Sequence, residues 1–196
     1  MKKILFLFFI LFSAINIFAE QKVGEYFNNY FDKNFEIEAS EKNGNLQTVF
    51  IGVVSEGSSN AFIAVEGKDL DKFKNSLELV KAKYIEWKKI AIENQVTEMN
   101  KEFGIEFPKV EIYWLGTKWW SSYKVKVNFR FMILDDGKMV ATWVPKVTHW
   151  DNKYIDETVY FVFSNTEDFD NLISQLNYQD FQNKLSQKKK NEDLFK

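Results

Sequence analysis

Residues 113–134, YWLGTKWWSSYKVKVNFRFMIL, contain three of the six tryptophans in the chain and then alternate apolar with basic side chains. Such alternation predicts a strand over 123–134, because successive side chains of a strand point to opposite faces. If the strand reaches back to the tryptophans, Trp119 belongs to the core face and Trp120 to the basic face. The even positions that follow Trp120 include Lys124, Lys126 and Arg130.

The turn after this strand is Asp135-Asp136-Gly137, which consists of turn-forming residue types. A two-residue loop would put Val140, Thr142, Val144 and Lys146 on the core face. A three-residue loop with a left-handed Gly137 would put Met139, Ala141, Trp143, Pro145 and Val147 there instead. The second set is more apolar, and a buried face decides the register, so we predict the three-residue loop. Lys126 then lies opposite Lys146, and Ser122 lies opposite Trp150.

The outer face of this predicted hairpin carries five cations and no acid, in Trp120, Lys124, Lys126, Arg130, Lys138, Lys146 and Trp150. Lysine and arginine bind carboxylate or phosphate, and aromatic rings stack on sugars. We therefore predict that an anionic glycan, a lipid headgroup or an acidic protein binds Trp120, Lys124, Lys126, Arg130, Lys146 and Trp150. Two alternatives are an ordinary solvated face and neutralisation by the helical acids Glu78, Glu86 and Glu93.

Upstream, three strands are predicted over 35–40, 46–54 and 61–65, and Asn43-Gly44 is a strong hairpin signal. Apolar residues then recur every three or four positions from Leu70 to Ala91, which predicts a helix with Asp69 as its N-cap. A second apolar stripe, rotated from the first, follows in Ile92, Val96, Met99 and Phe103. The helix is predicted to extend to this stripe, with a break near Asn94.

Downstream, strands are predicted over 110–115, 123–134, 139–147 and 158–163. Ser164 and Glu167 form a potential capping box for a helix that includes Phe169 and Leu172 and resumes through Phe181 and Leu185. The fold class is therefore α+β. An antiparallel sheet of about seven strands, in the order βββ-α-ββββ-α, packs one long helix and one C-terminal helix on one face. A single domain spans 20–187, and 188–196 is a polar tail.

The N-terminus resembles an export signal, with Lys2 and Lys3 before the apolar run 4–12 and a small residue, Ala19, at the predicted cleavage site. We predict a signal peptide over 1–19 and a periplasmic or secreted product without a transmembrane segment. The alternative is a retained anchor, although the apolar run is shorter than the roughly 20 residues of a membrane span. The chain has no cysteine, which excludes disulfides, thiolate metal sites and a lipid anchor attached through cysteine.

Removal of Lys2 and Lys3 changes the formal net charge from −2 to −4, which gives no reason to expect nucleic acid as a partner. His149 is the only histidine, so zinc sites built from several histidines are excluded. The sequence contains no phosphate-binding loop, nucleophile elbow or dinucleotide motif. We predict no catalytic residue, metal or cofactor, and a non-enzymatic binding or accessory protein of the bacterial envelope. The alternatives are a hydrolase with paired carboxylates and a structural protein that oligomerises through apolar surface.

Overall fold

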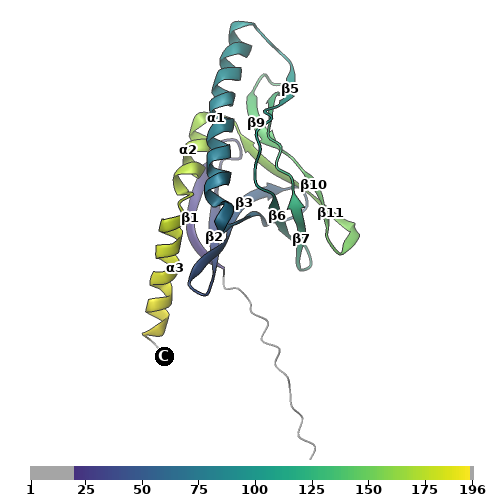
Figure 1. Ribbon diagram of the computed structural model, residues 1–196. Helices are drawn as coiled ribbons and strands as arrows, with labels where there is room; N and C mark the ends of the chain where they lie inside the picture. The colour runs from purple at the N-terminus through teal and green to yellow at the C-terminus, as the bar shows by residue number, and fades with distance from the viewer. Residues whose placement is uncertain (1–19, 195–196) are drawn as a thin grey trace, which may run out of the picture.

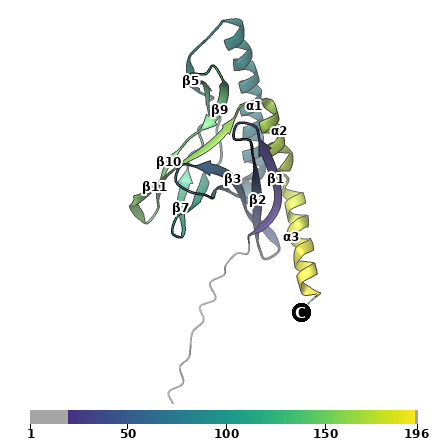
Figure 2. The same cartoon turned by 180° about the vertical axis from the view of Figure 1, so that it is seen from behind.

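The computed structural model describes residues 20–194 and shows three helices on one side of an antiparallel sheet (Figure 1; Figure 2). The helices are α1 (Leu70–Glu93), α2 (Thr166–Gln175) and α3 (Tyr178–Asp193), with a 3-10 turn η1 (Gly67–Asp69) before α1. The strands are β1 (Gln21–Asn28), β2 (Lys33–Lys42), β3 (Asn45–Ser55), β4 (Ala61–Glu66), β5 (Met99–Glu102), β6 (Val110–Leu115), β7 (Trp119–Val125), β8 (Arg130–Ile133), β9 (Met139–Trp143), β10 (Lys146–His149) and β11 (Asn152–Phe163). The α+β class is confirmed, but the described residues form eleven strands rather than about seven.

The sheet runs in the order β5-β8-β9-β11-β3-β4-β6-β7, and β2 and β1 branch from β3. β10 pairs with β11, and the backbone N–H of Trp150 donates to the carbonyl oxygen of Ser121 at 3.1 Å beside it. This bond connects β10 to β7 and closes a ring of six strands, β3, β4, β6, β7, β10 and β11. The closure covers edges that would otherwise expose unpaired backbone groups.

Both predicted hairpin loops are confirmed. Asn43 and Gly44 have φ of 55° and 79°, and Lys42 pairs with Asn45 around them. The second loop has three residues, since the N–H of Leu134 donates to the carbonyl of Lys138 at 2.8 Å and Gly137 has a φ of 79°. The predicted core-face residues Ala141, Trp143 and Val147 are buried, but so are Val140 and Thr142, so both faces of β9 are covered.

The long helix ends at Glu93, and the break predicted near Asn94 is confirmed. The predicted second helical stripe is wrong, because Met99 lies in β5, which pairs with β8. These residues still face the helix: the Phe103 ring stacks on the Trp87 ring with 5.0 Å between centroids. The spacing of the second stripe therefore reflects contact with α1 rather than membership of it.

The two ends of the chain show further differences from prediction. Asn165, not Ser164, caps α2, because its side chain accepts the N–H of Asp168 at 2.9 Å. Helix α3 buries Phe181 and Leu185 as expected, and it continues through the polar segment to Asp193. The predicted signal peptide, 1–19, lies outside the described residues. Within those residues, no helix combines the length and apolar character needed to cross a membrane.

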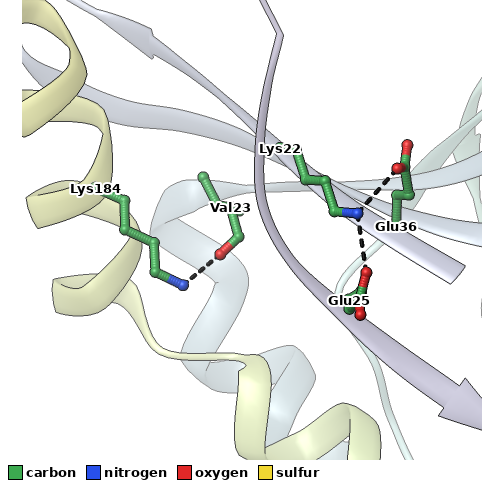
Figure 3. Close-up of polar contacts among 5 residues, drawn as sticks. All are labelled: Lys22, Val23, Glu25, Glu36 and Lys184. Carbon is green, nitrogen blue, oxygen red and sulfur yellow. Dashed lines mark hydrogen bonds and ion pairs between the residues drawn. The ribbon is translucent and has the colours of Figure 1, made fainter. Parts of the chain in front are cut away.

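Strand β1, which the sequence analysis did not predict, is held from two sides. The Lys184 ammonium of α3 donates to the carbonyl oxygen of Val23 (Figure 3). Lys22 forms ion pairs with Glu25 at 2.9 Å and with Glu36 of β2 at 3.0 Å (Figure 3). The strand thus joins the sheet to the C-terminal helix.

Candidate functional site

The two adjacent tryptophans point in the directions opposite to those predicted. Trp120 pairs with the buried Trp114 of β6, and directly paired residues of an antiparallel sheet point to the same face. Trp120 therefore faces the interior, whereas Trp119 is 48% exposed on the outer face. The reason is Lys124, whose left-handed φ of 58° interrupts the alternation on which the prediction depended.

The predicted basic hairpin face does not form as one acid-free surface. Arg130 forms an ion pair with Glu102 of β5 at 2.8 Å, and Lys146 forms one with Asp156 of β11 at 2.8 Å. Lys146 lies opposite Thr158 rather than Lys126, because β10 pairs with β11. The neutralising acids are therefore strand residues, not the helical Glu78, Glu86 and Glu93.

The remaining members of the predicted site are dispersed. Trp120 is partly buried, and its ring lies 5.0 Å from that of His149. Lys124 and Lys126 are exposed on either side of the break that ends β7. Trp150 is 61% exposed, with its ring centroid 6.0 Å from that of Tyr123. The structure thus separates these four residues among an interior position, a strand break and a loop, while Arg130 lies in β8 and Lys146 in β10.

A different feature occupies the sheet face turned away from the core. Residues of five strands, β2, β3, β4, β6 and β7, line a hollow of about 820 Å³ together with Glu20. Its floor follows a cross-strand row in which Glu38 pairs with Phe50, Phe50 with Ala64, and Ala64 with Glu111. The small Ala64 side chain between larger neighbours leaves space above the sheet, which accounts for the depression.

Aromatic rings form one wall of the hollow. Phe50 lies 5.8 Å from Tyr113 in an edge-to-face arrangement, and the Phe62 ring lies 5.9 Å from that of Trp119. Phe50 and Phe62 are also in edge contact, at 6.5 Å. The four rings therefore brace one another, and three of them, Phe50, Tyr113 and Trp119, line the hollow. Such packing holds a half-exposed tryptophan in a defined position.

The hollow is acidic. Among the residues that the structure describes, its lining includes Glu20, Glu66 and Glu111 and no lysine, arginine or histidine. The Tyr113 hydroxyl donates to Glu111 at 2.6 Å, and burial followed by this hydrogen bond raises the pKa of Tyr113. Glu66 forms an ion pair with Lys68. Within the described part of the chain, neither Glu20 nor Glu111 forms an ion pair.

Glu20, at the rim of the hollow, lies beside Glu38 of β2. Burial raises the pKa of Glu20, and burial, followed by the charges of Glu20 and Glu36, raises the pKa of Glu38. Two neighbouring carboxyl groups thus stand at this end of the hollow.

The described residues contain no group of three histidine, cysteine, aspartate or glutamate side chains able to hold a metal ion. His149 Nδ1 lies 2.8 Å from the Ser121 carbonyl oxygen, and the ring is in edge contact with Trp114 and Trp120. These neighbours hold the His149 ring against the inner side of β6 and β7. What the hollow offers is stacking surface and hydrogen-bond acceptors.

Comparison with known proteins gives no further guidance, because no family model, no curated protein and no solved structure matches the chain. Function must be argued from the geometry and chemistry of the hollow. Of the lining residues, the sequence analysis singled out Trp119 and wrongly assigned it to the core face. The alternation of Glu111 and Tyr113 with the buried Ile112 and Trp114 does mark an outer face of β6.

Proposed function

We propose that the protein is an exported, non-enzymatic binding protein whose ligand occupies the hollow beside Phe50, Tyr113 and Trp119. The observation that supports this most is a half-exposed tryptophan, held by other rings, at the wall of an 820 Å³ depression. Small-molecule sites commonly measure about 300–1,000 Å³ and combine aromatic side chains with a few placed polar groups. A ring that is already fixed loses little conformational entropy when a ligand stacks on it.

Export is proposed from the basic and apolar pattern of 1–19, and a binding role does not depend on it. A binding role is favoured over the hydrolase alternative because two of the three carboxylates that line the hollow already have partners, Glu111 in the Tyr113 hydroxyl and Glu66 in Lys68. The hairpin cations are less suited to a ligand, since Arg130 and Lys146 already have acidic partners.

The test is ligand-induced thermal stabilisation, using a panel of amines, amino acids, sugars and dicarboxylic acids. A ligand present at about 100 times its dissociation constant stabilises the folded state by about 2.7 kcal/mol. At about 2–4 °C per kcal/mol for a chain of this size, the midpoint should rise by about 5–11 °C. The Trp119→Ala variant should lose this rise.

The matched control is Trp150→Ala, which removes another exposed tryptophan that lies outside the hollow. This variant should respond to the ligand as the wild-type protein does. Absence of any stabilising compound in the panel, or a rise that survives Trp119→Ala, would count against the hollow as the binding site.

A further inference from the structure

The charged groups among the described residues that line the hollow are all carboxylates, and the hydroxyls of Ser40 and Thr48 beside them can both donate and accept. Glu20 and Glu111 contribute carboxylates, and Gln47, which also lines the hollow, has a buried Oε1 without a hydrogen-bond partner among the described residues. A ligand complementary to this lining must bring donors. A neutral sugar offers donors but leaves the carboxylate charge uncompensated, and an anion would be repelled.

The arrangement of charge favours a ligand with positive groups some distance apart. In the cross-strand row Glu38–Phe50–Ala64–Glu111, acids stand at both ends and apolar side chains in between. β2 and β6 are separated by three strand spacings of about 4.8 Å, so the two acidic ends lie about 14 Å apart at the backbone. Amino groups at the two ends of an aliphatic chain would match this row.

The aromatic wall suits the same chemistry. Ammonium groups are attracted to the faces of tryptophan and tyrosine rings, and methylene groups pack against phenylalanine and alanine. Trp119 and Tyr113 lie on the Glu111 side of the hollow, and Phe50 and Ala64 form its floor. An ammonium group at the end of the ligand can therefore contact the tryptophan and tyrosine rings, and the methylene groups in its middle can pack on the phenylalanine and alanine of the floor.

On these grounds, and resting on the proposed function, we infer that the hollow binds a linear organic cation with two or more amino groups. The volume of about 820 Å³ fits a small molecule of this kind rather than a folded partner.

Calorimetry with cadaverine and spermidine at neutral pH tests the inference, with pentylamine and pentanediol as matched probes that lack one or both amino groups. We expect spermidine and cadaverine to bind, pentylamine to bind about tenfold or more weakly, and pentanediol not to bind. Glu111→Gln should weaken diamine binding about tenfold or more, because it removes one charge-assisted contact. Glu102→Gln, which alters a carboxylate paired with Arg130 outside the hollow, should leave the affinity unchanged.

Folding of each variant is checked by its thermal midpoint without ligand. Binding of pentanediol as tight as that of cadaverine would overturn the inference, as would an unchanged affinity in Glu111→Gln. Binding of a lysine-rich peptide without binding of either polyamine would also overturn it and would identify a basic protein segment as the ligand. A neutral compound that stabilises the protein through Trp119, with no response to amines, would refute this inference and leave the proposed function standing. Silence across the whole panel would refute both.

Discussion

Asp168 provides the sharpest test of how the structure is held together. It is fully buried in the first turn of α2, and its carboxylate accepts four hydrogen bonds. The backbone N–H and the side-chain amide of Asn29 donate to Oδ1, both at 2.7 Å. The backbone N–H and the hydroxyl of Ser164 donate to Oδ2, at 2.7 and 2.9 Å. One carboxylate thus joins the turn after β1 to the end of β11.

The substitution Asp168→Asn keeps the size of the side chain but replaces one acceptor oxygen with a donor. Whichever oxygen is replaced, two donors lose their acceptor. Hydrogen bonds to charged groups contribute about 1.5–3 kcal/mol each, so the free energy of unfolding should fall by about 3–6 kcal/mol. At about 2–4 °C per kcal/mol, the thermal midpoint should drop by about 6–24 °C.

The assay is urea unfolding alongside thermal unfolding, because an unchanged dependence on urea concentration shows that the folded state is still compact. Asp170→Asn on the same helix is the control. Its carboxylate is exposed and paired with Lys81, so it should cost no more than about 1 kcal/mol. If the free energy of unfolding of Asp168→Asn lies within about 1 kcal/mol of the wild-type value, the four hydrogen bonds contribute less stability than we assign to them.

Three further outcomes follow from the structure. Trp120→Ala should cost about 3 kcal/mol by urea unfolding, and Trp119→Ala clearly less, because only Trp120 faces the interior; equal losses would contradict the face assignment. Glu38→Gln should raise the thermal midpoint at pH 7. The pKa of Glu38 is raised in the folded state, so its protonated carboxyl contributes stability below the ordinary pKa of about 4.3, and this contribution is lost as the pH rises through the raised value. Glutamine stays uncharged at every pH, so the stabilising effect of Glu38→Gln should vanish near pH 4. Lys124→Gly should be neutral or stabilising by up to about 1 kcal/mol, and Lys124→Val should destabilise by more than that, because the backbone there is left-handed; the reverse order in thermal melts would refute this conformation.

Local signals predicted those parts of the fold that depend on a few consecutive residues. Asn43-Gly44 and the turn ending at Gly137 each specify a loop through residue types that tolerate positive φ, and both loops form as predicted. The buried face of α1 also follows from a helical period within a single segment. The left-handed Lys124 carries no such signal, because a lysine inside an alternating run gives no reason to expect a break.

The parts that were missed depend on which segments lie side by side. Met99 has a helix-compatible spacing, and only its pairing with Ile133, more than thirty residues later, makes it a strand residue. The hollow also depends on pairing between strands that are far apart in the sequence. Outer-face positions could be read on each strand separately, but the pairing of Ala64 with Glu111 is made across α1 and β5, and no local pattern encodes it. Ion pairs such as that between Arg130 and Glu102 could not be predicted from the sequence for the same reason.

The core and the hollow lie on opposite faces of the same strands, and in β6 and β7 this sharing couples stability to binding. Trp114 and Trp120 fill the inner side of the β6–β7 pair beside His149, so the neighbouring Trp119 must face outward, where it meets Phe62. A one-residue slip of β7 would exchange the two faces, bring Trp119 inward and remove it from the wall of the hollow. Changes that shift this register should therefore reduce stability and ligand affinity together. Substitution of Glu111, which leaves the pairing intact, should reduce ligand affinity alone.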